Sequence, residues 1–266
     1  MKALLMMSTE DNSLIKMALT VVSGFLSQLG GALIMTVMAL KSFFWPPYRI
    51  REFLRHLDFI GSQSAFLIII TGAFTGMVTA LQGYNGMHRY GAESLVGATV
   101  ALALARELGP VLSALMVTGR VGSSMTAELG SMRNTQQIDA LSSMAVDPIH
   151  YLVSPRMVAS IITLPFLACI YGFSGMVGAY FVSTSYLDID PGAFMSGIRN
   201  YVDISDITHG LIKAVVFGLI MSMVACYKGF YATGGSRGVG VATTKAVVIS
   251  SVLILISDYV MTAIMF

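Results

Sequence analysis

The stretch that decides the fold is RELGPVLSALMVTGRVGSSMTAELGSMRNTQQIDALSSMAVDP, residues 106–148. Its first half is apolar enough for a membrane, yet it opens with the charged pair Arg106 and Glu107. Gly109-Pro110 follows directly and disturbs a helix, because proline cannot donate a backbone hydrogen bond. The second half is polar and lies between hydrophobic segments. Charges inside a bilayer and an ordered polar connection outside it are typical of a protein that moves a substrate and is driven by another component.

The composition indicates an integral membrane protein. The chain has 266 residues, of which 55% are hydrophobic and 11% charged, whereas soluble domains carry about 25% charged residues. Apolar runs of about 20 residues recur, each long enough to cross the hydrocarbon core. Backbone groups in a bilayer must be hydrogen-bonded internally, so the spans are predicted to be helices. The net charge of only +2 does not suggest a nucleic-acid partner.

The hydropathy pattern predicts a single domain, 1–266, with five membrane helices. Their expected ranges are 60–84, 95–119, 157–182, 209–230 and 242–265. In the first, Gly72 and Gly76 form a GxxxG pair. This pair either lets another helix approach closely or reflects the general frequency of glycine in membrane helices. In the second, Gly109-Pro110 predicts a kink.

Residues 13–40 allow two interpretations. They are long and apolar but include Lys16, Gln28 and Gly30-Gly31, so the segment either crosses the membrane or lies in its interface. Hydropathy slightly favours a span. Either way, the basic and aromatic stretch 41–55 belongs at the cytoplasmic headgroup level.

Lys and Arg residues are distributed unevenly around the predicted spans. Twelve of the sixteen lie in three segments on one side, 1–58, 120–156 and 228–245. The opposite loops hold only Arg89 and Arg199. The positive-inside rule therefore puts the polar 120–156 segment in the cytoplasm. The acidic loop 188–206, which ends at Asp206, is predicted to lie outside.

Arg106 and Glu107 are the first candidates for function. An uncompensated charge at mid-membrane costs at least about 2.5–3.5 kcal/mol, so such residues pair or face a polar cavity. Adjacent helical residues point about 100° apart, which argues against a direct pair between these two. They either line a cavity for a polar headgroup, or snorkel, or pair structurally with Lys213. Lys213 lies near the outer end of its span, which favours snorkelling for it.

The polar segment predicts a short cytoplasmic helix at about 135–144. Asn134 is its predicted cap, with Gln137 at the capping-box position. Ile138 and Leu141 then share one face, with Asp139 beside them. Such a helix suits docking to a soluble partner, or it simply packs on its own domain.

No catalytic, cofactor or metal site is predicted. The chain has no GxxxxGK[ST] phosphate loop, and Ser123 and Ser124 have no base at a recognisable spacing. The two cysteines fall within apolar spans, so no disulfide is expected. The histidines lack the spacing of metal ligands and lie at His56, His88, His150 and His209.

Four segments resemble the MlaE permease family, the membrane subunits of ABC transporters that work with MCE-domain proteins. They are LQGY at 81–84, RELGPVLSALMVTGRVGSSMTAELGSMRNTQQIDAL at 106–141, MAVDPI at 144–149 and SPR at 154–156. The resemblance extends from about residue 13 to 266, and the central block is long and specific.

The resemblance implies an all-α membrane protein with five transmembrane helices per subunit. An amphipathic helix in the cytoplasmic leaflet precedes them, which makes 13–40 interfacial, against the hydropathy preference. A cytoplasmic coupling helix, 134–144 here, lies between the second and third spans. The first membrane helix helps to frame a central lipid cavity in a homodimer.

The resemblance also assigns roles to individual residues. Arg106, Glu107 and Tyr90 are expected at the lipid cavity. The segment that docks on the ATPase is expected to include Glu128, Arg133, Gln137, Asp139 and Leu141. Many relatives have Glu where this chain has Gln137, so a hydrogen bond rather than a charge is expected there.

The implied function is that of a permease moving phospholipid, or a related lipid, between the bacterial inner membrane and a periplasmic MCE protein, which maintains outer-membrane lipid asymmetry. The partners implied are a second copy of the chain, an ABC ATPase subunit that hydrolyses the ATP, the MCE protein and a small STAS-domain subunit.

Two rivals belong to other classes. An ion-coupled carrier or channel would use Arg106, Glu107 and Lys213 as a charge relay, but the inverted repeats of many such carriers are not evident. A lipid-modifying intramembrane enzyme would need a nucleophile and a base. An ATPase that co-purifies with the chain separates the permease from both.

Overall fold

The computed structural model describes residues 27–46 and 49–265. The described residues form helices and no strands, which confirms the all-α prediction. A helix at 27–43 comes first. The α-helices that follow are α2 (Ile50–Ile60), α3 (Ser62–Met87), α4 (Val96–Ala103), α5 (Gly109–Val117), α6 (Ser123–Asn134), α7 (Gln137–Ser143), α8 (Ser154–Ser185), α9 (Pro191–Tyr201), α10 (Ile204–Phe230) and α11 (Gly235–Met265).

Short π and 3₁₀ turns join several of these helices into longer rods. The π turns are Leu104–Leu108, Thr118–Gly122 and Ile149–Val153. The 3₁₀ turns are His88–Tyr90 and Glu93–Leu95. Because helical structure continues through the π turns, α4, α5 and α6 form one long helix that contains two π turns.

Within the described residues, five helical segments are long and apolar enough to cross a membrane, as predicted. They are Ile50–Tyr90, Glu93–Asn134, Ile149–Ser185, Ile204–Phe230 and Gly235–Met265. Each is longer than its predicted range, because hydropathy detects only the part that matches the hydrocarbon core. The second was expected to end at 119, but its helix continues through the polar residues to Asn134.

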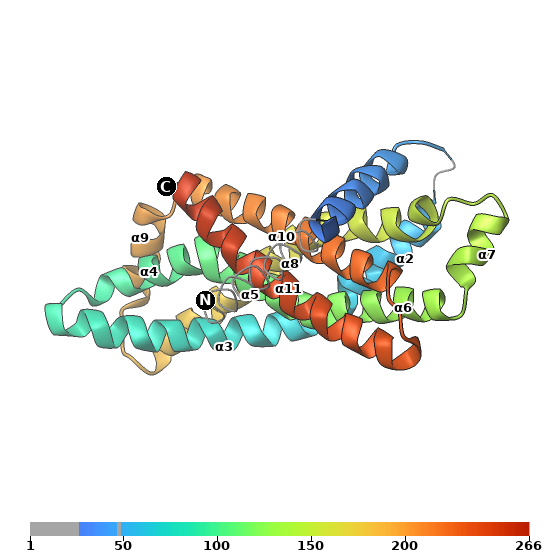
Figure 1. Cartoon of the computed structure of the whole chain (residues 1–266). Coiled ribbons are helices and arrows are strands. Elements are labelled where there is room, and N and C mark those ends of the chain that lie inside the picture. The colour runs from blue at the N-terminus through green and yellow to red at the C-terminus, as the bar shows by residue number, and fades with distance from the viewer. Residues whose placement is uncertain (1–26, 47–48, 266) are drawn as a thin grey trace, which may run out of the picture.

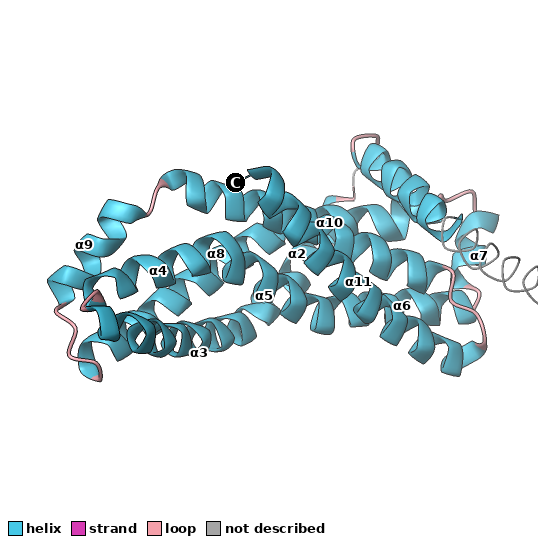
Figure 2. Cartoon of the chain, turned by 60° about the vertical axis from the view of Figure 1, so that its left-hand side comes forward, coloured by secondary structure: helices cyan, strands magenta, loops and turns pink. Residues whose placement is uncertain are grey.

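The two ends of the bundle carry different short helices. Figures 1 and 2 show α7 at one end and α9 at the other, which agrees with the predicted placement of 120–156 and 188–206 on opposite sides. Part of the 188–206 loop was not expected to be helical. There, the Ala193 N–H donates to the Asp190 carboxylate at 2.7 Å, and Pro191 occupies the first turn of α9.

The GxxxG pair has a packing role. A Cβ on Gly72 would lie 2.7 Å from the Tyr171 carbonyl oxygen, and a Cβ on Gly76 only 1.8 Å from that of Gly175. Backbones of α3 and α8 therefore meet at a distance that only glycine allows. The Tyr171 hydroxyl also donates to Thr75 Oγ1 at 2.7 Å.

The helix at 27–43 packs on the bundle by one face. Ala32, Met35 and Ala39 are buried in a cluster that includes Cys226 of α10, while Val37 on the opposite face is exposed. The first half of the predicted 13–40 segment, 13–26, lies outside the described residues. The choice between a span and an interfacial helix stays a prediction.

Candidate functional site

Arg106 and Glu107 lie on the π turn Leu104–Leu108. The Gly109 N–H donates to the Leu104 carbonyl five residues earlier, which defines the turn. Pro110, which follows, has no N–H with which to continue the ladder. The predicted disturbance at Gly109-Pro110 thus takes the form of a π turn, a feature often found at functional sites.

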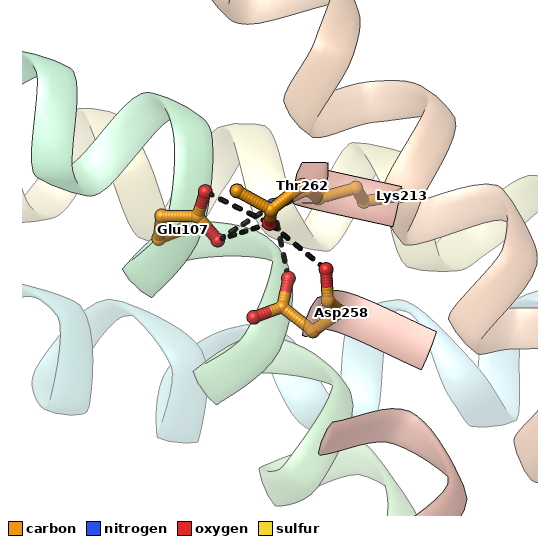
Figure 3. A network of polar contacts seen from close by, with 4 residues as sticks. All are labelled: Glu107, Lys213, Asp258 and Thr262. Carbon is orange, nitrogen blue, oxygen red and sulfur yellow. Dashed lines mark hydrogen bonds and ion pairs between the residues drawn. The ribbon is translucent and has the colours of Figure 1, made fainter. Parts of the chain in front are cut away.

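Glu107 belongs to a polar network that joins three spans (Figure 3). The Lys213 ammonium of α10 donates to Glu107 Oε2 at 2.5 Å, Asp258 Oδ1 at 3.0 Å and Thr262 Oγ1 at 2.7 Å. These three bonds use all three protons of the lysine. The Lys213 side chain is 0% exposed, so the residues around it exclude solvent from the ammonium group.

Thr262 closes the network on α11. Its hydroxyl lies 2.8 Å from the Asp258 carbonyl, one helical turn earlier, and 3.3 Å from Glu107 Oε1. With both carboxylates ionised, Glu107, Asp258 and Lys213 together carry one excess negative charge. The Glu107 and Asp258 side chains are 36% and 20% exposed, respectively, so solvent or a ligand can reach the carboxylates but not the ammonium.

Arg106 pairs with a different residue of α10. Its Nε donates to Asp206 Oδ1 at 2.8 Å, and its Nη2 lies 2.6 Å from the same oxygen. The other Asp206 oxygen accepts from the Asp203 N–H at 3.0 Å, in a capping box at the start of α10. Asp206 therefore fixes both the helix end and the guanidinium.

Gly210 lies between Asp206 and Lys213 and lets α10 approach the π turn. A Cβ at this position would lie 2.1 Å from the Ala105 carbonyl oxygen. Asp206 and Lys213 are two helical turns apart, about 10 Å along the axis. The adjacent residues Arg106 and Glu107 thus reach toward opposite ends of one α10 face.

These contacts decide several predictions. The structural pairing with Lys213 is confirmed for Glu107, and the argument against a direct Arg106–Glu107 pair agrees with their separate partners. Snorkelling of Lys213 is wrong, because its side chain is completely buried. Asp206 is not part of an exposed outer loop but is buried in the first turn of α10.

Sequence reasoning missed Asp258 and Thr262 as members of the site. Asp258 could have been found, since it is the only acidic residue in the 31-residue helix α11. An ionisable residue inside a membrane span is a functional candidate by default. Thr262 carries no comparable signal.

An apolar hollow of about 320 Å³ lies next to this centre. It is lined by residues of α4, α5, α8, α9 and α10. The lining includes Ala105, which precedes Arg106, and Pro110 and Gly210, each within one helical turn of a charged residue of the centre. Arg106 and Glu107 themselves are not in its lining. Tyr90 lies in the turn after α3 and is 86% exposed, away from this hollow's lining.

At the other end of the bundle, Glu128 of α6 pairs with Arg156 of α8. The Glu128 Oε1 lies 3.0 Å from the Arg156 Nη2. The Arg156 side chain is only 3% exposed, and its Nη1 also donates to the Leu152 carbonyl at 2.6 Å. This ion pair links α6 to the first turn of α8.

The helix α7 differs from its prediction at its start. Asn134 is the last residue of α6 and not a cap, and Gln136, with φ of 58°, precedes α7 without a side-chain cap. Ile138 is buried, and Leu141 is partly buried against the same cluster. The apolar face of α7 therefore packs on its own domain.

The opposite face of α7 is polar and open. Gln137 and Asp139 are exposed. Asp139 Oδ1 accepts from Arg133 Nη1 of α6 at 2.5 Å, which connects α7 to the end of the second span. Of the residues predicted for docking, three are exposed and two partly buried; the exposed ones are Glu128, Gln137 and Asp139, and the others Arg133 and Leu141. All but Gln137 and Leu141 take part in an ion pair.

Comparison with known proteins gives a consistent result. The family model described as Permease MlaE matches residues 53–264. A probable ABC transporter permease protein of Rickettsia felis is 45% identical over 242 residues, covering 91% of this chain and 93% of the relative. The intermembrane phospholipid transport system permease protein MlaE of Haemophilus influenzae is 40% identical over 214 residues, covering 80% and 82%. Protein TRIGALACTOSYLDIACYLGLYCEROL 1 of Arabidopsis thaliana is 38% identical, covering 81% and 62%.

Proposed function

The chain belongs to the MlaE permease family, and we propose that it is the permease subunit of an ABC transporter for phospholipid or a related lipid. In this proposal it lies in the bacterial inner membrane and exchanges lipid with a periplasmic MCE protein, maintaining outer-membrane lipid asymmetry. The observation that carries the proposal is the charged centre of Arg106 and Glu107, tied to α10 and α11 beside an apolar hollow.

An amphiphile requires both parts of this arrangement. Acyl chains favour apolar walls, and the hollow lined by Ala105, Pro110 and Gly210 offers them. A headgroup needs charged or polar partners, and the Arg106 and Glu107 side chains are 35% and 36% exposed, respectively. A second copy of the chain would enlarge the site, with Tyr90 at its outer margin. The name of the Haemophilus influenzae relative supports phospholipid as the substrate class.

The energy source is proposed to be a separate ATPase subunit, because the sequence has no phosphate loop. Its docking site is proposed to be the exposed face of α7, with Gln137 and Asp139. Ile138 and Leu141 pack this helix on the bundle, so movement of α7 would pass into the membrane helices. The Arg133–Asp139 and Glu128–Arg156 pairs would transmit it to α6 and α8. A small STAS-domain subunit completes the proposed assembly.

The test is lipid transfer in proteoliposomes that contain the chain, its ATPase and labelled phospholipid. Arg106→Ala/Glu107→Ala should abolish ATP-dependent transfer while the ATPase still co-purifies. A matched control is Asp188→Asn/Arg199→Ala, which removes one exposed acid and one exposed base near α9 and keeps at position 188 a residue type that tolerates its φ of 51°. Transfer at the wild-type rate by the first double variant would exclude these residues from the mechanism.

The rival function is an ion-coupled carrier or channel. The observation that favours it is the network of Glu107, Lys213 and Asp258, which links ionisable groups on three spans. Such a carrier would show ion-gradient-driven flux without any ATPase. The same proteoliposomes without ATPase, given a proton or sodium gradient, distinguish the two functions.

A further inference from the structure

A second hollow, of about 650 Å³, lies where α10 turns into α11. Among the residues that the structure describes, its lining includes three cationic side chains, Lys228, Arg237 and Lys245, and no Asp or Glu. It is separate from the apolar hollow beside Arg106 and shares no lining residue with it. Neither the transport proposal nor the docking proposal uses it.

The positive charge in this hollow is not compensated by the described part of the chain. Arg156 and Lys213, inside the bundle, each contact a carboxylate. Among the described residues, Lys228, Arg237 and Lys245 take part in no ion pair. Lys228 Nζ donates to Gln28 Oε1 at 2.6 Å, which is a neutral acceptor. Three like charges around one hollow repel each other, and an anion bound among them would relieve the repulsion.

Neutral donors complete the lining. The hydroxyls of Tyr227, Tyr231 and Thr233 belong to residues that border the hollow. The connection between the helices turns at Gly234 and Gly235, with φ of +93° and +66°, and α11 begins there. The start of a long helix carries partial positive charge on its first N–H groups, which adds to the attraction for an anion.

The hollow lies at the end of the bundle that is predicted to be cytoplasmic. The α10–α11 turn lies at the same end of the bundle as α6 and α7 (Figure 1), which the Lys and Arg distribution assigns to the cytoplasm. Val241 and Ala242 also line the hollow, and the long apolar run of α11 begins just beyond it, after Lys245. Anionic lipids in this leaflet attract Lys and Arg by about 1 kcal/mol for each residue.

We propose that this hollow binds the phosphate of an anionic lipid in the cytoplasmic leaflet. Lys228 and Lys245 contact the phosphate from two helices, Arg237 reaches it from the first turn of α11, and the acyl chains lie along Val241 and the exposed face of α11. The bound lipid connects the helix at 27–43, through Gln28, to the α10–α11 turn. This site is independent of the transport proposal, because it needs neither ATPase nor MCE protein.

The test measures lipid retained by the full chain. The protein is placed in nanodiscs of phosphatidylcholine with a minority of phosphatidylglycerol, extracted, and examined by native mass spectrometry. The wild-type chain should retain phosphatidylglycerol preferentially, and Lys228→Gln/Lys245→Gln should reduce this preference about tenfold or more. The control Lys41→Gln/Arg51→Gln removes two exposed charges from the same predicted side and should leave it unchanged.

Other outcomes overturn the proposal. Equal retention by both double variants, or an equal loss in both, would show that no specific lipid site exists here. If inorganic phosphate binds the chain in pure phosphatidylcholine nanodiscs as tightly as phosphatidylglycerol does, the ligand is free phosphate and not lipid. If the Lys228→Gln/Lys245→Gln variant keeps its lipid but loses ATPase co-purification, the hollow is a protein-docking surface. Should this variant fail to fold, Arg237→Gln on an exposed side chain replaces it, with the same criteria.

Discussion

Gly210 of α10 lies so close to the Ala105 carbonyl that an added Cβ would come within 2.1 Å of the oxygen. This contact allows the π turn to bring Arg106 and Glu107 to Asp206 and Lys213 simultaneously. The charged centre therefore requires a residue without a Cβ at position 210.

Gly210→Ala is expected to separate α10 from the π turn and weaken both ion pairs. Overpacking of this kind costs about 1–3 kcal/mol, and lipid transfer should fall together with the free energy of unfolding measured in mixed micelles. Gly240→Ala in α11 is the matched control, because its Cβ would meet no atom within 4 Å and the residue does not line the apolar hollow. Equal stability of Gly210→Ala and wild type would mean that the helices adjust without loss.

Lys213→Met tests the cost of the buried network. It leaves Glu107 and Asp258 facing each other without a cation, and breaking a buried pair in this way costs about 3–5 kcal/mol. The free energy of unfolding should therefore decrease by about 3 kcal/mol, at the lower end because both carboxylates are partly exposed.

The triple variant Glu107→Gln/Lys213→Met/Asp258→Asn separates structure from transport. Removing all three charges should restore much of the lost stability, because no charge is then left unpaired. Lipid transfer should stay low if Glu107 contacts the headgroup. Full recovery of both quantities would assign the network a structural role only.

Gly76→Val tests the contact between α3 and α8. Its Cβ would come within 1.8 Å of the Gly175 carbonyl oxygen, which a rigid helix pair cannot accommodate. The variant is expected to lose the monodisperse peak in size-exclusion chromatography of a fluorescent fusion. Gly86→Val in the same helix, with nothing within 4 Å of its Cβ, should keep the peak. A normal peak for Gly76→Val would contradict the packing described here.

Exchange of Arg133 and Asp139 tests docking on α7. Arg133→Asp/Asp139→Arg preserves the intramolecular ion pair with opposite polarity, so the fold should remain stable. If the ATPase recognises the Asp139 carboxylate, co-purification should drop at least tenfold, and transfer should stop. Single Asp139→Ala should have a similar effect on binding. Normal co-purification of both variants would move the docking site away from α7.

The sequence was sufficient for the helical class and the five spans, because the bilayer requires long apolar helices whatever their packing. The distribution of Lys and Arg also placed the segments 120–156 and 188–206 on opposite sides, and the structure has α7 and α9 at opposite ends of the bundle. The ends of the rods were less predictable. Polar residues such as those from Ser123 to Asn134 continue a helix outside the membrane without any hydropathy signal.

The members of the charged centre were harder to predict than its existence. Glu107 and Lys213 are 106 residues apart, and Lys213 and Asp258 are 45 apart, so their contact depends on how the helices rotate against each other. Nothing in the local pattern specifies that rotation. The prediction that Asn134 caps the cytoplasmic helix was wrong, because α6 continues to Asn134 and the new helix begins only after Gln136.

Because the Lys213 ammonium already donates to three oxygens, another acceptor can bind it only by replacing one of them. Two of the oxygens, Asp258 Oδ1 and Thr262 Oγ1, belong to α11, so any separation of α10 from α11 at this level would take two of its three acceptors from a buried ammonium. Because an uncompensated buried charge is costly, these two helices are expected to move together as one unit.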